Sequence, residues 1–212
     1  MKNKTIYLIR HGQTDYNKMG VAQGSGVDTS LNQMGRAQAE AFYEAYKDVR
    51  FDKIYTSSLR RTVETVSHFI EKGIPYEQLS GLNEFSWGNK EGKPFQDEDQ
   101  DHYLAVTNAW KEGNLTAAIE GGENPLQVAE RQEKALELIM SRKEEKTILI
   151  CMHGRAMRVL LCNMLNYDLS RMDTFEHTNT CLYKVVYTGS MFNVITHNDT
   201  GHLCEINSKQ FE

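Results

Sequence analysis

The stretch TILICM, residues 147–152, decides the fold. Every residue after the first is apolar, and the run has the length of a strand that is buried on both faces of a sheet. Met157, Leu160, Leu161 and Met164 follow it at the spacing of a helix that packs one side against a core. A buried strand leading directly into such a helix is typical of an α/β fold.

Strands and helices alternate along the rest of the chain. TIYLIR (5–10) and KIYTS (53–57) are expected strands, and CLYKVVY and MFNVITH around TGS predict a β-hairpin. Helices are expected over residues 32–49, 59–70 and 124–139. Asn32 and Asn124 are the expected N-caps of the first and last of these. We therefore predict an α/β fold: a three-layer sandwich with a mostly parallel central sheet and helices on both faces.

Residues 85–122 interrupt this alternation with FSWGNKEGKPF, the acidic run QDEDQD and EGGEN. We interpret this segment as an inserted loop and helix, the helix at about 99–112, that covers one end of the sheet within a single domain of residues 1–212. Four aromatic residues of this region could line a pocket, but anchoring of the insertion to the core is the favoured interpretation. They are Phe85, Trp87, Phe95 and Trp110. The acidic run is expected to be a solvated helix start, or otherwise to repel multiply charged substrates.

Composition and charge exclude several classes of protein. The net charge of −5 and pI near 5.8 argue against a general nucleic-acid binder. No apolar run approaches the length of a membrane span, and a signal peptide is not expected because IYLI is short. Cys151 and Cys162 lie in apolar patterns without a CxxC spacing and are expected to be buried thiols. We expect a cytoplasmic protein with no membrane or nucleic-acid partner.

Residues suited to catalysis follow three of the expected strands. His11 follows the first strand, Arg60 and Arg61 follow the second with Ser57, and His153 and Gly154 follow residues 147–152. Ligands of open α/β sheets bind beyond the carboxyl ends of the strands, so these groups are expected to converge at one edge. Gly154 opens a helix, whose N–H groups and dipole favour an anion.

The chemistry that this set suits is phosphoryl transfer. Arg10 and Arg61 can bind phosphate oxygens in a bidentate manner. A neutral imidazole at His11 is a nucleophile toward phosphorus, and neighbouring cations disfavour its protonation. Gly12 is expected to let the backbone approach the ligand, and Glu84 is the best carboxyl group to protonate a leaving alkoxide. Each residue taken alone has an ordinary structural interpretation, so the hypothesis rests on the set.

Six segments of the chain resemble one family in the same order. They are LIRHGQTDYN, GVDTSLNQMGRAQAE, YTSSLRRTVET, LNEFSWGNKEG, GGENPLQVAERQEKAL and MHGRAMR. Together they resemble the histidine phosphatase superfamily, in its phosphoglycerate mutase-like branch. The resemblance covers almost the whole chain and matches Arg61, not Arg60, to the phosphate-binding arginine of the third segment.

The resemblance implies a mechanism and a set of site residues. His11 would be phosphorylated and then release phosphate, and Glu84 would act as general acid and then base. Arg10, Arg61 and His153 would hold the phosphoryl group, with Gly154 beside them. Asn17, Gln23 and Gly24 match positions that line the pocket. The resemblance implies no metal and no cofactor, and His197 and His202 flank NDTG, which we expect to be a turn, not a ligand pair.

Three functions remain open at this point. The favoured one is a metal-independent phosphatase that hydrolyses small phosphomonoesters through phosphorylated His11. The alternative is a phosphoglycerate mutase, and a non-catalytic module that binds a phosphorylated ligand is the third. The segment after Glu84 is shorter than in cofactor-dependent mutases and lacks their proline-rich stretch. Phe85 and Ser86 also replace the basic and aromatic residues often found there in mutases. The partner expected is a small phosphorylated substrate, and the resemblance allows a homodimer.

Overall fold

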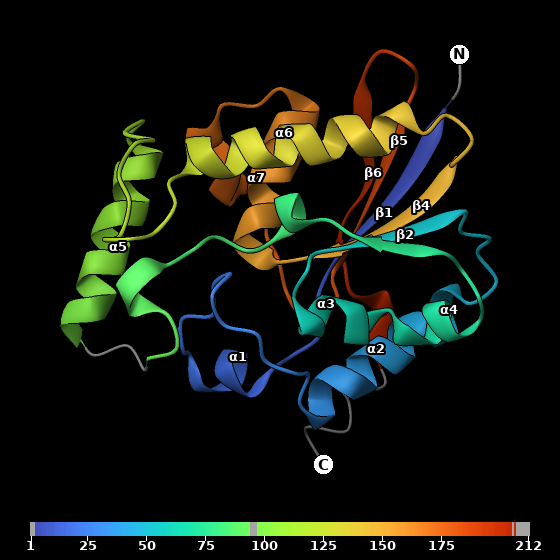
Figure 1. Cartoon of the computed structure of the whole chain (residues 1–212), viewed down its shortest axis with the longest axis horizontal. Coiled ribbons are helices and arrows are strands. Elements are labelled where there is room, and N and C mark those ends of the chain that lie inside the picture. The colour runs from blue at the N-terminus through green and yellow to red at the C-terminus, as the bar shows by residue number, and fades with distance from the viewer. Residues whose placement is uncertain (1–2, 94–96, 205, 207–212) are drawn as a thin grey trace.

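The computed structural model of the chain describes residues 3–93, 97–204 and 206. Its centre is one sheet of six strands in the order β3-β2-β4-β1-β5-β6 (Figure 1). The strands are β1 (Lys4–Arg10), β2 (Lys53–Thr56), β3 (Tyr76–Gln78), β4 (Thr147–Met152), β5 (Leu182–Tyr187) and β6 (Phe192–Asp199). The first four strands are parallel, whereas β5 and β6 form an antiparallel hairpin at the edge beside β1. The predicted mostly parallel sheet is confirmed.

Strand β4 lies at the centre of the parallel part of the sheet. It pairs with β1 on one side and with β2 on the other, and all residues from Ile148 to Met152 are fully buried. Arg10 pairs with Met152, and Thr56 pairs with Cys151. The chain therefore leaves three adjacent strands at the same edge.

Helices cover both faces of the sheet, so the molecule has three layers: helices, sheet and helices (Figure 1). One face carries α6 (Pro125–Ser141) and α7 (Gly154–Leu165), and the other carries α2 (Gln33–Tyr46), α3 (Arg60–Thr65) and α4 (Ser67–Glu71). Side chains alternate along each strand, so Ile6, Leu8, Ile148 and Ile150 join the α6–α7 cluster. Their neighbours Tyr7, Ile9, Leu149 and Cys151 pack with Phe42 and Phe69 of the opposite layer.

The remaining elements are short or lie at the ends of the sheet. They are α1 (Asp15–Met19), α5 (Asp97–Lys111) and the 3₁₀ turns η1 (Ser80–Leu82), η2 (Gly88–Lys90), η3 (Leu169–Thr174) and η4 (Gly201–Leu203). Strand β6 includes Asn198 and Asp199, so only the end of NDTG lies outside the strand. The predicted buried states of Cys151 and Cys162 are confirmed.

Two helix starts match the expected caps, and one predicted helix is divided. The Asn32 side chain accepts a hydrogen bond from Gly35 N, and Asn124 forms a capping box with Gln127. The single helix expected over residues 59–70 was wrong, because α3 ends at Thr65 and α4 begins at Ser67. Thr65 Oγ1 donates to the carbonyl of Arg61 at 2.6 Å, a contact of the kind that bends helices.

The segment 85–122 is tied to the core by stacked aromatic rings. Phe85 stacks on Trp87 and on Trp110, with ring centroids 5.3 and 5.4 Å apart, and all three side chains are buried. This contact supports the interpretation of these residues as anchors, and Phe95 lies outside the described residues. The side chains of residues 97–99 in the acidic run are also outside the description.

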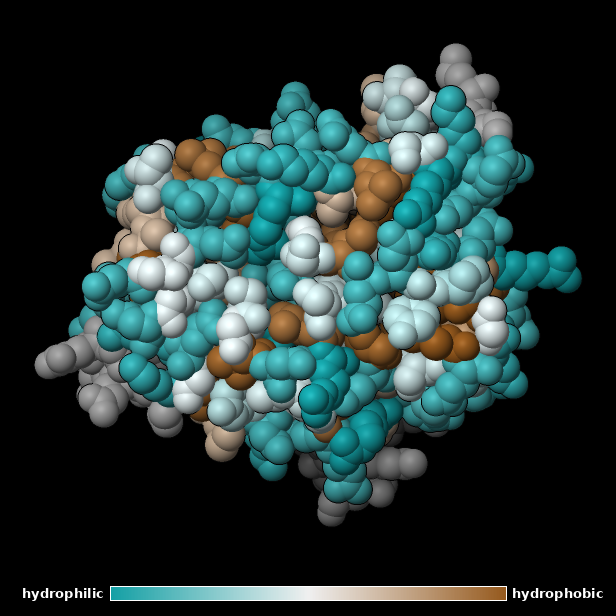
Figure 2. All heavy atoms as spheres, in the orientation of Figure 1, coloured by the Kyte–Doolittle hydropathy of each residue, from teal (hydrophilic) through white to brown (hydrophobic). Residues whose placement is uncertain are grey.

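The face of the molecule drawn in Figure 2 is mostly hydrophilic, with several separate apolar areas. Among the described residues, no helix is both long and apolar enough to cross a membrane. Exposed large apolar side chains are scattered over several elements, as Met19, Tyr167 and Met191 show. A homodimer and a cytoplasmic location therefore stay predictions.

Candidate active site

His11 is the first residue after β1 and is almost completely buried. Its backbone N–H donates to the carbonyl of Met152, which continues the pairing of β1 with β4. The ring Nδ1 lies 2.7 Å from the carbonyl of Gly12. A carbonyl only accepts, so this contact places the proton on Nδ1 and leaves the lone pair of Nε2 unprotonated. Burial, then Arg61 and Arg10, hold the pKa of His11 well below its usual value, so the ring is neutral.

Gly12 has a packing role at the start of α2. A Cβ atom at this position would lie 2.6 Å from the carbonyl oxygen of Gly35, at the start of α2. The Gly12 N–H donates to Thr65 Oγ1 at the end of α3. The missing side chain therefore allows close packing of the backbones of Gly12 and Gly35, and the approach of the Gly12 backbone to a ligand stays a prediction.

His153 faces His11 from the end of β4. The two ring centroids are 5.2 Å apart. Arg61 Nε donates to Nδ1 of His153 at 3.2 Å, so Nε2 carries the proton and donates to Ser57 Oγ at 2.8 Å. Burial is the main cause that holds the pKa of His153 well below its usual value, with Arg61 next. Both histidines are therefore neutral.

Arg61 is fully buried, and its guanidinium also donates to the carbonyls of Val27 and Gly24. Burial lowers the pKa of Arg61 to about 10, which leaves the group charged at neutral pH. The neighbouring Arg60 is exposed. The geometry thus agrees with the resemblance, which selected Arg61 over Arg60.

Arg10 is held by a histidine that the sequence did not single out. Arg10 Nη1 lies 3.3 Å from Nδ1 of His177, and Arg10 Nε is buried without a hydrogen-bond partner among the described residues. Burial, followed by Arg10, lowers the pKa of His177 to about 2, so Nδ1 accepts from Arg10. The His177 ring lies 2.8 Å from the place that a Cβ of residue 154 would occupy, which explains Gly154.

Glu84 lies at the N-terminus of α7. Its Oε1 accepts hydrogen bonds from the backbone N–H groups of Phe85 and Ala156, and its Oε2 accepts one from Arg155 N–H. The carboxyl group is thereby fixed at a helix end, where free N–H groups are available. Its position between β4, α7 and segment 85–122 brings it to the same edge as the two histidines.

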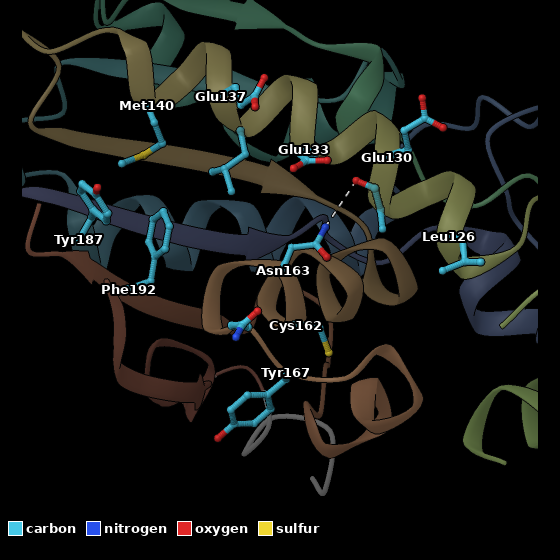
Figure 3. Close-up of a pocket in the computed structure, with 13 residues that line it drawn as sticks. Leu126, Glu130, Glu133, Glu137, Met140, Cys162, Asn163, Tyr167, Tyr187 and Phe192 are labelled. Carbon is cyan, nitrogen blue, oxygen red and sulfur yellow. Dashed lines mark hydrogen bonds between the residues drawn. The ribbon is translucent and has the colours of Figure 1, made fainter. Parts of the chain in front are cut away.

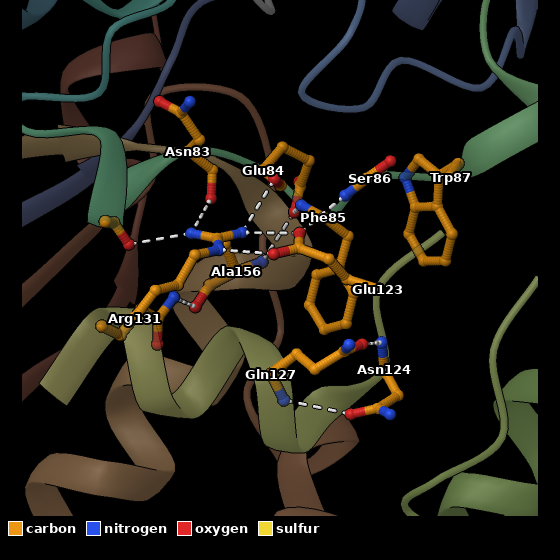
Figure 4. Close-up of polar contacts among 12 residues, drawn as sticks. Asn83, Glu84, Phe85, Ser86, Trp87, Glu123, Asn124, Gln127, Arg131 and Ala156 are labelled. Atoms are coloured by element: carbon orange, nitrogen blue, oxygen red, sulfur yellow. Dashed lines mark hydrogen bonds and ion pairs between the residues drawn. The ribbon is translucent and has the colours of Figure 1, made fainter. Parts of the chain in front are cut away.

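An arginine outside the expected set holds the backbone around Glu84 (Figure 4). Arg131 of α6 donates to the carbonyls of Gly81, Asn83 and Glu84 at 2.8–2.9 Å. It also forms a bidentate pair with Glu123, whose Oε2 accepts from Ser86 N–H. The only sequence signal for this pair was the segment GGENPLQVAER, to which no role had been given.

The three remaining expected residues lie around the loop that follows β1. Asn17 caps the short α1 with Thr14, and its Oδ1 also contacts Asn179. Gln23 Oε1 accepts from Thr14 and Thr29, whereas its buried Nε2 has no partner among the described residues. Gly24 has no room for a side chain, because a Cβ would lie 2.2 Å from Glu91 Oε1.

A cleft of about 300 Å³ opens at this edge of the sheet. Among the expected residues, Arg10, Glu84 and Gly154 line it. Trp87, one of the four aromatic residues considered as pocket lining, also lines it. Five further lining residues were not expected as ligand contacts: Ala22, Tyr103, Arg155, Arg158 and His177. His11 is only 3% exposed and lies beneath this cleft with His153 and Arg61. Among the described residues, no three His, Cys, Asp or Glu side chains are placed to share a metal ion.

A larger groove of about 640 Å³ lies elsewhere, between α6, α7 and the β5–β6 hairpin (Figure 3). Glu130, Glu133 and Glu137 line one of its walls, and Phe192 lies opposite them. None of the expected site residues lines it. Carboxylates repel phosphate, so the smaller cleft is the better candidate for a phosphorylated ligand.

Comparison with known proteins finds similar chains among phosphatases. A probable phosphatase of Schizosaccharomyces pombe is 28% identical over 203 residues, covering 93% of this chain and 90% of its own. Phosphoserine phosphatase 1 of Hydrogenobacter thermophilus is 29% identical and is covered over 94% of both chains. The structure of a mycobacterial glucosyl-3-phosphoglycerate phosphatase superposes with a TM-score of 0.81 at 26% identity, over 93% of this chain and all of the other.

The family itself is identified by a model of the histidine phosphatase superfamily (branch 1), which matches residues 6–200. The relatives are named phosphatases, and the prediction of a phosphoric monoester hydrolase is confirmed at the level of the enzyme class. The chain belongs to the histidine phosphatase superfamily.

Proposed function

We propose that this protein hydrolyses small phosphomonoesters through a phosphohistidine intermediate on His11, without a metal ion. The observation that carries the proposal is the state of the His11 ring. Its Nδ1–H donates to Gly12, and burial beside Arg61 and Arg10 lowers its pKa, so an unprotonated Nε2 is available. A neutral imidazole held in one tautomer is a ready nucleophile toward phosphorus.

The groups around His11 suit a bound phosphoryl group. Arg10 Nε and Gln23 Nε2 are buried donors without a hydrogen-bond partner among the described residues, and a phosphate oxygen would satisfy either of them. The centroid of the His153 ring lies 5.2 Å from that of the His11 ring, and Arg61 donates a hydrogen bond to His153. Fixed cations and N–H donors stabilise the charge of a transferring phosphoryl group, which is the main catalytic contribution in such reactions.

The reaction then takes two balanced steps. His11 Nε2 forms a bond to phosphorus while the bond from phosphorus to the leaving oxygen breaks, and protonated Glu84 gives its proton to that oxygen. In the second step, the Glu84 carboxylate removes a proton from water as the water oxygen attacks phosphorus, and the electron pair of the P–N bond returns to Nε2. Asn17, Gly24 and Gly154 shape the site as the contacts above describe. We propose one catalytic domain over residues 1–212, with segment 85–122 forming part of the cleft wall.

The decisive experiment is hydrolysis of p-nitrophenyl phosphate in excess EDTA, with acid-quenched samples analysed for phosphorylated protein. Activity that resists EDTA, together with a phosphoprotein whose label maps to His11, is the expected result. His11→Ala is expected to lower kcat/KM by on the order of 10³-fold or more, because it removes the nucleophile. Activity lost in EDTA or retained in His11→Ala would contradict the mechanism.

Assays on the same protein preparation distinguish the phosphatase from the two other candidate functions, a mutase and a binding module. A mutase would convert 3-phosphoglycerate to 2-phosphoglycerate when primed with 2,3-bisphosphoglycerate, without net release of phosphate. A binding module would bind phosphate but neither hydrolyse nor isomerise any of these esters.

A further inference from the structure

One wall of the cleft carries two arginines that the phosphoryl chemistry does not require. Arg155 and Arg158 lie in the first turns of α7 and both line the cleft. Both donate to the same oxygen of Asp173, in η3. Lys111, at the end of α5, lies 3.4 Å from the other oxygen of that carboxyl group. Three cations therefore share one carboxylate.

The excess positive charge persists at neutral pH. Burial by itself would raise the pKa of Asp173, but Arg155 and Arg158 lower it, so the carboxylate is ionised. It still balances only one of the three cations around it. Arg10 and Arg61 lie deeper, beside His11, and are available to the phosphoryl group itself. A substrate that carries only a phosphate would leave the outer arginines without a matching anion.

The two arginines also have donors left for a ligand. Arg155 donates to Asp173 and to Tyr103 Oη, and Arg158 donates to Asp173 and to the carbonyl of Phe175. These bonds use two of the five N–H groups of each guanidinium, counting partners among the described residues. The side chains are 14% and 16% exposed, so a ligand can reach them only from the cleft side.

Arg155 is held in position before any ligand binds. Its guanidinium carbon lies 5.8 Å from the ring centroid of Trp110 and 6.0 Å from that of Tyr103. The hydrogen bond to Tyr103 Oη, at 3.0 Å, fixes the group further. A planar donor that is already oriented loses little entropy when it binds a carboxylate or phosphate in a bidentate manner.

We propose that Arg155 and Arg158 form a second anion subsite, and that the substrates of this enzyme are phosphomonoesters with a second anionic group, a carboxylate or another phosphate. The inference rests on the proposed function, because it assigns the first phosphate to His11. The expectation that the acidic run repels such substrates stays a prediction, because the side chains of residues 97–99 lie outside the description. Among the described lining residues of the cleft, three arginines outnumber the single carboxyl group of Glu84.

The test compares substrates that differ only in the second group. 3-Phosphoglycerate carries a carboxylate where glycerol 3-phosphate carries an uncharged hydroxymethyl group. 1,3-Propanediol bisphosphate and its monophosphate form the matching pair for a second phosphate. We expect wild-type kcat/KM to favour at least one charged member by about 10-fold or more, with a preference that declines as salt rises. The favoured pair identifies the anion.

Variants of the two arginines test whether these residues cause the preference for a second anionic group. Arg155→Gln and Arg158→Gln are each expected to reduce the ratio of kcat/KM values within the favoured pair by about 10-fold, the size of one charge-assisted hydrogen bond. Arg171→Gln is the matched control, because it removes one exposed positive charge from η3 without touching the cleft. Its ratio is expected to equal that of the wild type.

Two results would overturn the subsite. One is a wild-type ratio near one for both pairs, a result that does not depend on the folding of any variant. The other is a ratio that Arg155→Gln and Arg158→Gln leave unchanged, which would make the arginines a structural clamp around Asp173. Failure of the proposed function looks different, since p-nitrophenyl phosphate would then not be hydrolysed at all.

Discussion

Gln23 buries a side-chain N–H group that has no protein partner among the described residues, beside a site built for an anion. We predict that Gln23→Glu weakens inhibition by inorganic phosphate by about 10-fold or more. The carboxylate keeps the acceptor for Thr14 and Thr29 but replaces the donor with a negative charge. The inhibition constant for phosphate, measured with p-nitrophenyl phosphate as substrate, checks this prediction.

Thr29→Val is the control for that change. It removes one hydroxyl donor to Gln23 Oε1 and leaves the Nε2 group in place, so the phosphate inhibition constant is expected to change less than about threefold. Equal weakening in both variants would mean that Gln23 supports the loop and does not contact the anion.

At the scale of single residues, the sequence predicted the site residues near the strand ends but not the residues that hold them in place. His11 and His153 directly follow their strands and Arg61 lies in the first turn of α3 after β2, so the parallel register brings them to one edge. His177 lies in the loop between η3 and β5, where no spacing relates it to Arg10. Its contact with Arg10 depends on how that loop packs over Gly154, which a single sequence does not specify.

Arg131 of helix α6 donates hydrogen bonds to the backbone carbonyls of Gly81, Asn83 and Glu84. We predict that Arg131→Lys lowers kcat about 10-fold or more for alkyl phosphates but much less for p-nitrophenyl phosphate. Lysine keeps the charge and lacks the planar fork, so Glu84 loses its position. An alkoxide needs the proton of Glu84, whereas p-nitrophenolate leaves without it.

The comparison needs kcat for glycerol 3-phosphate and p-nitrophenyl phosphate in each protein. Lys134→Gln serves as the control, because Lys134 pairs with Glu130 on the exposed side of the same helix. Both of its rates are expected to match the wild type. If Arg131→Lys lowers the two rates equally, Arg131 acts on the fold in general and not through Glu84.

The elements themselves were predictable where one local signal acted alone. Strand β4 and the caps at Asn32 and Asn124 each follow from a few neighbouring residues. The break between α3 and α4 was missed because the apolar spacing continues across it. The hydroxyl of Thr65, which binds the backbone of Arg61, changes the geometry without changing that spacing.

At the scale of the whole molecule, four described histidines have pKa values below the ordinary 6.5 in the folded state: His11, His153, His177 and His202. Unfolding restores the ordinary value, so below about pH 6.5 the unfolded chain binds more protons than the folded one. The free energy of unfolding is therefore highest above that pH and falls as the pH decreases, by up to about 1.4 kcal/mol per pH unit for each histidine.

Urea unfolding between about pH 7.5 and 5.5 measures this dependence. His177→Gln is expected to have a shallower slope than the wild type by about one histidine, while its amide oxygen can still accept from Arg10. An identical slope in the two proteins would show that His177 is protonated inside the fold or already neutral in the unfolded chain.

Glu84 is supported by the main chain of Arg155 and Ala156, not by their side chains. Evolution can therefore replace the side chain at position 155 and still keep the hydrogen bonds that hold the acid. The same residue lines the cleft, where its guanidinium belongs to the proposed second anion subsite. A descendant of this enzyme could acquire a new substrate by a single codon change at that position and inherit its catalytic acid intact.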